Sequence, residues 1–339
     1  MTLPERIAAF VALGEELKKL TPEQKHEIAS RAGNANPWFD ERNVTNALNG
    51  IIYLLDKENL EDWLFAYDFS HINPQKVGVI MAGNIPMVGF HDFLTVLISG
   101  HELYAKLSSE DTFLMKMLAD HLIRIEPRFD KNIHFVELLK EVDAVIATGS
   151  DNTARYFEFY FARKPHIIRK NRTSLGILTG SETTADFQAL GEDIFRYYGL
   201  GCRNVSKLLV PENYAFKSFF EAIEPFHYIL DHHKYQNNYD YNKSILLVNG
   251  SPHLDNGFLL LSQSDQLVSP ISVLFYQTYT DAADLGNQLK NIKDKTQALV
   301  SADGWYPNSI AFGQAQCPAV WDYADGVDTL AFLISLKKV

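Results

Sequence analysis

The chain has 339 residues, which corresponds to about two domains. Its composition of 46% apolar, 12% aromatic and 22% charged residues is that of a soluble globular protein and excludes disordered, collagen-like and coiled-coil chains. The 31 Lys and Arg residues against 42 Asp and Glu residues give a net charge of −11, which disfavours a nucleic-acid partner.

The N-terminal residues predict helices. Apolar residues from Ile7 to Leu20 follow a helical stripe, and Thr21-Pro22-Glu23-Gln24 has the pattern of an N-cap, a first-turn proline and a capping partner. A further stripe runs from Val44 to Leu55 and stops at an expected turn, 56–59. We expect these helices to cover the domain that follows.

From Val77 onward, short β-rich runs alternate with helical stretches. The expected strands are 77–82, 103–107, 133–136, 144–148, 166–169 and 175–178, and the expected helices are 111–125, 152–162 and 184–198. This alternation predicts a parallel sheet with helices on both faces. We expect the first domain to end at Tyr198.

A second α/β series follows Cys202. Its expected strands are 207–210, 245–249, 258–261, 273–279, 298–301 and 309–312, with helices at 214–223 and 281–292. The stretch Asp231–Lys243 is rich in His, Tyr, Asn and Asp, and is the best candidate for a long exposed loop. The expected domains are therefore residues 1–198 and 199–320, followed by a C-terminal segment, 321–339.

The cysteine count and the character of the first twenty residues indicate a cytoplasmic protein. Two cysteines are too few for a disulfide framework, and Met1–Leu20 mixes charged and apolar residues, unlike a secretory leader. The longest apolar runs, such as 77–82 and 245–248, are far shorter than the roughly 18 residues of a membrane-spanning helix. We expect no membrane span.

Cys202 is the best candidate nucleophile. It lies in Gly199-Leu200-Gly201-Cys202-Arg203, directly after an expected helix, where the glycines let the backbone turn sharply and approach a ligand. Arg203 or backbone N–H dipoles would favour its thiolate. A free cysteine is also commonly a small buried apolar residue, and this alternative stays open. For Cys317 we expect a structural role.

Three expected strand ends carry groups suited to a nucleotide. These are Gly83-Asn84-Ile85-Pro86, Lys106-Leu107-Ser108-Ser109 and Thr148-Gly149-Ser150. Open parallel sheets bind ligands beyond the carboxyl ends of their strands, and a cation, hydroxyls and backbone donors there suit ribose or phosphate. The first loop is not a Gly-x-Gly-x-x-Gly motif, so an ordinary strand-to-helix turn stays an alternative.

Other catalytic motifs are missing from the sequence. The two cysteines are distant, and His232 and His233 are neighbours that would point apart, so we expect no metal site. Walker, Gly-x-Ser-x-Gly and Cys-x-x-Cys motifs are absent. His91 follows the first loop directly and is a candidate for facing a substrate, with a surface or core role as the alternative.

Taken in this order and spacing, the motifs resemble the aldehyde dehydrogenase superfamily and, within it, the LuxC-like fatty acyl-CoA reductases. The resemblance spans nearly the whole chain and includes Gly201-Cys202 as the nucleophile loop and Asp325–Asp328 as the terminal Asp-Gly pattern. It implies an α/β fold of two α/β domains with the active site in the cleft between them. N-terminal helices would precede these domains, and the C-terminal segment would pack back on the cofactor domain.

The chain departs from the superfamily pattern at two places. Arg169 to Arg172 align where hydrolytic members carry the glutamate that activates water, so no carboxylate is expected there. An acyl thioester on Cys202 would then survive to meet a hydride, as a reductase requires. Gln266 aligns with the glutamate that binds the cofactor ribose, and Ser269-Pro270 replaces the usual Gly-Pro.

The resemblance implies NAD(P)H-dependent reduction of an acyl-CoA, expected to be a fatty acyl-CoA, to an aldehyde through a Cys202 acyl-enzyme. The Cys202 backbone N–H and the Asn84 side chain would stabilise the oxyanion. Residues expected to bind the cofactor are Gly83, Pro86, Lys106, Ser108, Gly149, Ser150 and Gln266. Lys106 and the neighbouring hydroxyls favour NADPH, with NADH left open.

Several questions stay open at the level of sequence. The acyl donor is either CoA or an acyl carrier, and the alternatives to this reaction are an acyl-phosphate reductase or a non-catalytic scaffold that binds a nucleotide or an acyl carrier. A homo-oligomer is left open as well.

Overall fold

The computed structural model describes residues 1–337 and divides the chain into two compact units. Unit 1 comprises Met1–Asn171 and the residues from Pro318 onward, and unit 2 comprises Arg172–Cys317. The expected division at residue 198 differs from this one, because strand Thr173–Ile177 pairs within the sheet of unit 2. Among residues 1–337, no helix combines the length and the apolar character needed to cross a bilayer.

Four helices open unit 1, and a side chain caps each of them. They are α1 (Leu3–Lys18), α2 (Pro22–Ala35), α3 (Glu41–Leu54) and α4 (Lys57–Phe65). Thr2 and Thr21 form capping boxes, and Asp40 and Asp56 accept backbone N–H bonds. The expected turn at 56–59 therefore begins α4.

A five-stranded parallel sheet forms the centre of unit 1, in the order β3-β2-β1-β4-β5. Its strands are β1 (Lys76–Ile80), β2 (Glu102–Lys106), β3 (Ile133–Phe135), β4 (Ala144–Thr148) and β5 (His166–Arg169). The connecting helices are α5 (Phe90–Ser99), η1 (Ser109–Asp111), α6 (Thr112–Ile125), η2 (Pro127–Lys131) and α7 (Asp151–Phe161).

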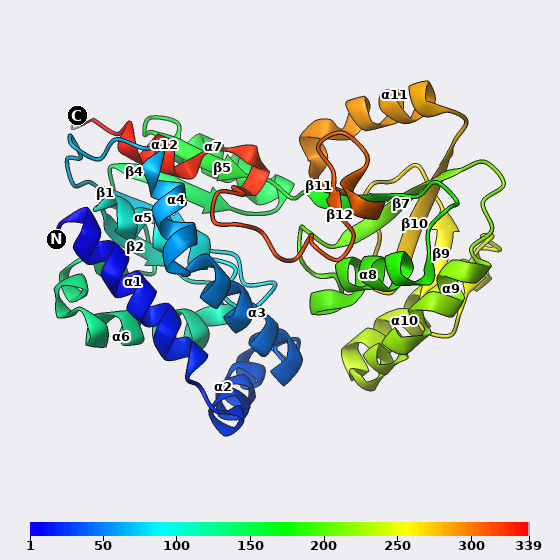
Figure 1. Ribbon diagram of the computed structural model, residues 1–339, viewed down its shortest axis with the longest axis horizontal. Helices are drawn as coiled ribbons and strands as arrows, with labels where there is room; N and C mark the ends of the chain where they lie inside the picture. The colour runs from blue at the N-terminus through cyan, green and yellow to red at the C-terminus, as the bar shows by residue number, and fades with distance from the viewer. Residues whose placement is uncertain (338–339) are drawn as a thin grey trace. The chain divides into compact units, whose positions relative to one another are not determined.

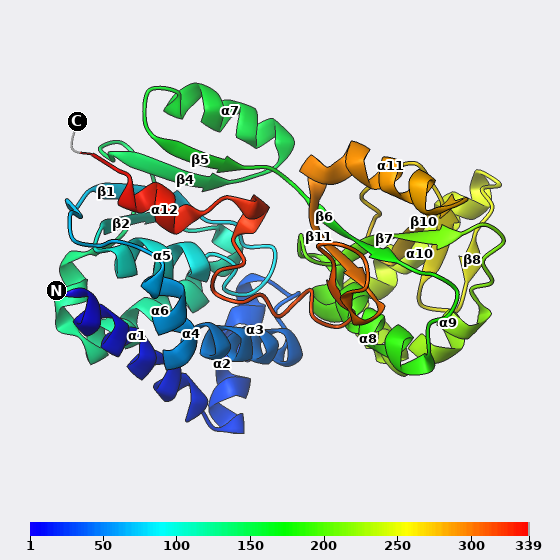
Figure 2. The ribbon, with the colours of Figure 1, turned by 45° about the horizontal axis from the view of Figure 1, so that its top comes forward.

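Helices cover both faces of this sheet, as the alternation of elements predicts. On one face, Phe157 and Phe161 of α7 pack against Val145 and Ala147, and Figure 2 shows α7 beside β4 and β5. On the other face, α5 contacts β1 and β2, and α1 packs outside α5. The C-terminal helix α12 (Thr329–Ile334), which follows η7 (Ala324–Gly326), also packs against α5 (red in Figure 1).

Unit 2 is built on a seven-stranded sheet in the order β12-β11-β6-β7-β10-β9-β8. Its strands are β6 (Thr173–Ile177), β7 (Val205–Pro211), β8 (Leu254–Asp255), β9 (Leu260–Gln263), β10 (Val273–Tyr279), β11 (Thr296–Ser301) and β12 (Ile310–Ala311). All pairs are parallel except β8 with β9. Most of these strands follow the expected β-rich runs closely.

Helices lie on both faces of this second sheet as well (Figure 1). They are α8 (Thr184–Phe195), η3 (Arg196–Gly199), α9 (Lys217–Ile223), η4 (Glu224–Asp231), α10 (His233–Val248), α11 (Ala282–Ile292), η5 (Lys293–Lys295) and η6 (Ala302–Gly304). Leu285 and Leu289 of α11 pack against β6 and β7 on one face. Leu190 of α8 lies close to Gly176 on the other.

The predictions of a loop at Asp231–Lys243 and of a strand at 245–249 are both wrong. Helix α10 covers most of this stretch, and Tyr235 and Tyr239 form its buried face. The Tyr235 hydroxyl donates to the Phe258 carbonyl oxygen at 3.1 Å, and the Tyr239 hydroxyl donates to Asp255 at 2.6 Å. Because tyrosines with partnered hydroxyls supply the apolar face, the composition looks like that of a polar loop.

Candidate active site

Cys202 lies in the turn between η3 and β7, and its side chain is exposed. The three residues Tyr197, Tyr198 and Gly199 all adopt left-handed backbone conformations, with φ values of 55°, 58° and 77°. Both tyrosine side chains are buried. A β-carbon disfavours this region of the backbone map, so the approach to Cys202 is strained and must be held by its surroundings.

The Asn204 side chain supplies much of that support. It is 2% exposed. Its Nδ2 donates to the carbonyl oxygens of Asp193 at 3.0 Å, Ile194 at 3.2 Å and Arg196 at 2.7 Å, and its Oδ1 accepts from the Gly201 N–H at 2.8 Å. Carbonyls at the end of a helix have no partner within it. Asn204 therefore joins the end of α8 to the loop that carries Cys202.

One further bond connects this loop to β6, and another connects the strand after it to a neighbouring loop of unit 2. The Ser174 hydroxyl on β6 donates to the Cys202 carbonyl oxygen at 3.1 Å. The Ser206 hydroxyl on β7 donates to the Leu267 carbonyl oxygen at 2.9 Å. The exposed Gln266 therefore lies on a loop bonded to the strand that follows Cys202.

In unit 1, the expected cofactor loops follow neighbouring parallel strands and therefore lie at one edge of the sheet. A β-carbon on Gly83 would lie 2.5 Å from Ser108 Oγ, so the first two loops are in contact and only glycine fits there. Asn84 is exposed, Pro86 is buried and Lys106 is half-buried.

Both expected cofactor-binding serines also cap helices. Ser108 Oγ accepts the Glu110 N–H at 3.2 Å and caps η1, and Ser150 Oγ accepts the Thr153 N–H at 3.2 Å and caps α7. Gly149, just before this second cap, is closely packed, because an added β-carbon would lie 3.1 Å from the Thr153 side chain. The cofactor roles of these residues stay predictions.

A comparison with protein families decides the chain's relationship. The model for the acyl-CoA reductases named LuxC matches residues 14–223, well over half of the chain. The chain belongs to the LuxC acyl-CoA reductase family. Membership places it among oxidoreductases that act on acyl or aldehyde groups, and it confirms the family expected from the sequence.

Solved structures of aldehyde dehydrogenases share the fold, which confirms the expected fold class. A putative aldehyde dehydrogenase from Burkholderia cenocepacia has a TM-score of 0.64 at 14% identity over 89% of this chain and 74% of its own. KauB from Pseudomonas aeruginosa has a TM-score of 0.65 at 15% identity over 89% and 72%. The Mycobacterium tuberculosis enzyme complexed with NAD+ has a TM-score of 0.62 at 14% identity over 89% and 73%. A search of curated proteins found no match.

In this LuxC-family chain, Arg169 ends β5 and forms a buried ion pair. Its Nη1 and Nη2 donate to the two carboxylate oxygens of Asp92 at 2.6 and 2.9 Å, and Nη2 also donates to Thr329 Oγ1 at 2.9 Å. Both charged side chains are buried. At the strand end where the resemblance places a water-activating glutamate, this chain has Arg169, whose guanidinium donates hydrogen bonds to side chains of α5 and α12.

Two polar residues near Cys202 and the first loop were missed by sequence reasoning. Lys207 on β7 is 2% exposed, its Nζ donates to Gln277 Oε1 at 2.6 Å, and burial lowers its pKa. Asp111 at the end of η1 is 3% exposed and accepts the Met87 N–H. For Lys207, the available signal was a lysine inside a β-rich run. For Asp111, the sequence pattern offers no such signal.

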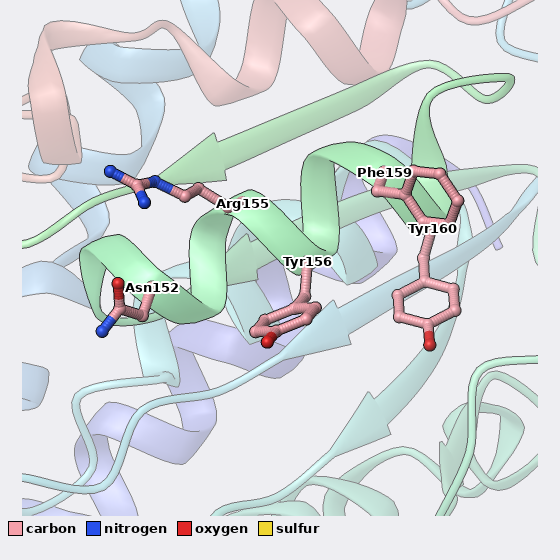
Figure 3. Close-up of a pocket in the computed structure, with 5 residues that line it drawn as sticks. All are labelled: Asn152, Arg155, Tyr156, Phe159 and Tyr160. Carbon is pink, nitrogen blue, oxygen red and sulfur yellow. The ribbon is translucent and has the colours of Figure 1, made fainter.

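An open pocket of about 690 Å³ lies along the exposed side of α7 (Figure 3). Its lining residues are Asn152, Arg155, Tyr156, Phe159 and Tyr160. Figure 3 shows the two tyrosine rings projecting from the same side of the helix. The aromatic side chains are 65%, 80% and 71% exposed, so this helix presents flat apolar surface beside one cation and one amide.

His91 has a packing role in unit 1. Its Nε2 lies 2.7 Å from the Val320 carbonyl oxygen, and its ring contacts those of Trp63 and Tyr323. Cys317, for which a structural role was expected, has an exposed side chain whose Sγ lies 3.5 Å from Arg196 Nη1. Within residues 1–337, His, Cys, Asp and Glu side chains form no group of three that could hold a metal ion.

Proposed function

We propose that this protein reduces an acyl thioester to an aldehyde through an acyl-enzyme formed on Cys202. The observation that carries the proposal is the exposed Cys202 thiol on a strained loop whose backbone Asn204 and Ser174 hold in place. Positioning of a nucleophile in this way lowers the barrier to attack on a bound carbonyl.

In the proposed reaction, Cys202 is the protein group that forms a covalent bond to the acyl group. The Cys202 thiolate adds to the thioester carbonyl carbon, the bond from that carbon to the CoA sulfur breaks, and the released CoA thiolate takes up a proton. A nicotinamide cofactor, when bound, supplies the hydride that reduces the acyl carbon. Cys202 Sγ then leaves that carbon, which releases the aldehyde and restores the thiolate. The Cys202 backbone N–H and Asn84 are the proposed oxyanion donors.

The residues present in unit 1 fit a dinucleotide. Gly83 and Gly149 place no side chain at one position in each of the loops after β1 and β4, and Lys106 supplies a cation at the end of β2. The pocket on α7 offers aromatic faces for an adenine ring at Tyr156, Phe159 and Tyr160, in the second half of the helix that Ser150 caps. We assign the cofactor to unit 1, with NADPH preferred because Lys106 and Ser108 suit a 2′-phosphate. The remaining expected cofactor residue, Gln266, belongs to unit 2.

The ion pair between Arg169 on β5 and Asp92 supports reduction of the acyl-enzyme over its hydrolysis. Arg169 is bonded to Asp92 and Thr329, so an arginine held in an ion pair occupies the position where the resemblance places the water-activating glutamate. An acyl thioester on Cys202 is then lost to hydride rather than to water. A LuxC-family relationship agrees with this outcome.

The test is direct observation of the acyl-enzyme. The purified protein is incubated with acyl-CoAs of short to long chain without nicotinamide, and intact mass and peptide mapping locate any adduct. We expect an acyl adduct on Cys202 that disappears on addition of NADPH, with NADH as a parallel arm. The Cys317→Ser variant, which removes the second exposed thiol, should behave like the parent, and Cys202→Ala should form no adduct.

Two results would change the proposal. An adduct with acyl phosphate but not with acyl-CoA would assign the donor to the phosphate class. Failure of every donor to acylate a folded protein would favour a non-catalytic scaffold.

A further inference from the structure

A buried carboxyl group lies beside the first loop of unit 1. Asp111 is 3% exposed, and its Oδ2 accepts the Met87 N–H at 2.6 Å. Among the residues that the structure describes, its Oδ1 has no hydrogen-bond partner. A buried polar atom without a partner is rare in native proteins and calls for an explanation.

The group that Asp111 binds is itself strained. Met87 has φ of 56°, in the left-handed region, although its side chain is 3% exposed and carries a β-carbon. Its carbonyl oxygen accepts the Phe90 N–H at 2.9 Å, where α5 begins. The strained residue therefore ends the loop that starts at Gly83, and a bond at its N–H fixes how that loop enters the helix.

Asp111 is the second link between the loops that follow β1 and β2. The first link is the close packing of Gly83 against Ser108. Both links lie on the η1 segment, since Ser108 caps it and Asp111 ends it. One link fixes the start of the Gly83–Met87 segment and the other fixes its end, with Asn84 between them.

We propose that Asp111 is a positioning residue that holds Met87 in the left-handed region and so keeps the Gly83–Met87 segment in the shape that receives the dinucleotide. The inference rests on the proposed function for the ligand, and on the structure alone for the loop. It explains why a carboxyl group is kept where, among the described residues, one backbone N–H donates to it.

The inference predicts which substitutions can replace Asp111. Burial raises the pKa of Asp111 to about 8, which favours the neutral form of the carboxyl group at pH 7. Asparagine is neutral, has nearly the same shape and keeps one acceptor for the Met87 N–H. Leucine fills similar space and accepts nothing.

The test compares Asp111→Leu, Asp111→Asn and the double variant Asp111→Leu/Met87→Gly in the full chain. Two quantities are measured: amide hydrogen exchange of the peptide that covers 83–89, and the Kd for NADPH. We expect Asp111→Leu to speed exchange and raise the Kd by roughly tenfold each, the approximate preference of an L-residue against this region. Asp111→Asn should stay within about twofold on both measures. The double variant should recover most of the loss, because glycine adopts positive φ freely.

Asp120→Leu, at an exposed position on α6, is the matched control and should change neither quantity. Unchanged loop exchange in a folded Asp111→Leu protein would overturn the inference, and so would a double variant as impaired as Asp111→Leu. If Asp111→Leu does not fold, Met87→Gly is compared with Asp111→Ala/Met87→Gly, where equal loop exchange supports the inference and a tenfold difference overturns it. Absence of NADPH binding by the parent protein counts against the proposed function, whereas the exchange comparison still decides the role of Asp111.

Discussion

Replacement of Asn204 by aspartate tests whether one side chain holds the Cys202 loop. The change keeps the shape of the side chain but turns its donor group into an acceptor. The carbonyl oxygens of Asp193, Ile194 and Arg196 then lose a donor at 2.7 to 3.2 Å and face a carboxylate oxygen instead. The bond from the Gly201 N–H survives, because an oxygen still accepts it.

The expected loss of stability follows from these bonds. A buried hydrogen bond contributes about 1 kcal/mol net, and a buried polar group left without a partner costs about 1–3 kcal/mol. Three carbonyls that share one donor group give an expected decrease of about 3–5 kcal/mol in the free energy of unfolding. Against a total of about 5–15 kcal/mol, this is a large fraction of the stability of the protein.

Urea unfolding measures the effect, with Asn237→Asp as the matched control. Asn237 is exposed on α10, so the same chemical change there should alter the unfolding free energy by no more than about 0.5 kcal/mol. In the folded Asn204→Asp protein, acylation of Cys202 by acyl-CoA should slow at least about tenfold, because the thiol is no longer held in position. A decrease in stability below about 1 kcal/mol would refute the view that Asn204 supports this loop.

Three further results are expected. Gly83→Ala should destabilise the protein by about 1–3 kcal/mol in thermal unfolding, because its β-carbon would lie 2.6 Å from Ser108 Cβ, whereas Gly50→Ala, in open space on α3, should be neutral or stabilising. Between pH 3.8, the ordinary pKa of aspartate, and about pH 8, the folded state keeps a proton on Asp111 that the unfolded state releases. The free energy of unfolding of the parent should therefore fall relative to that of Asp111→Asn as the pH rises through this range. Parallel plots of unfolding free energy against pH for the two proteins would contradict the raised pKa of the buried carboxyl group. Tyr323→Phe should lower stability by about 1–3 kcal/mol, because the Trp63 Nε1–H loses its acceptor at 2.7 Å, and an unchanged melting temperature would argue against this contact.

The strands were largely predictable, and the reason is physical. Runs such as 144–148 and 273–279 are rich in apolar, aromatic and β-branched residues, and they match β4 and β10. Parallel strands buried on both faces carry this pattern in the sequence itself. α10 was not predictable in the same way, because its buried face consists of tyrosines whose hydroxyls find acceptors only in the folded chain.

The residues of the candidate site also fall into a predictable group and an unpredictable group. Cys202 and the loop at Gly83 were predictable, because glycine at a sharp turn or a close approach is required by local geometry. Asn204 and Asp111 act through bonds to backbone groups on other segments, and an asparagine or aspartate in sequence looks the same whether it is buried or exposed. Placement of such a residue depends on the tertiary fold, which local patterns do not contain.

The return of the chain to unit 1 after Cys317 has a consequence for synthesis on the ribosome. Unit 2 is one continuous stretch and can fold as soon as it has emerged, whereas unit 1 lacks α12 until the residues that follow unit 2 have been made. Until then, Arg169 lacks the Thr329 hydroxyl that accepts one of its hydrogen bonds. The part of unit 1 that precedes unit 2 therefore waits for its C-terminal helix, and the surface of α5 that α12 covers stays open for as long as unit 2 takes to be made.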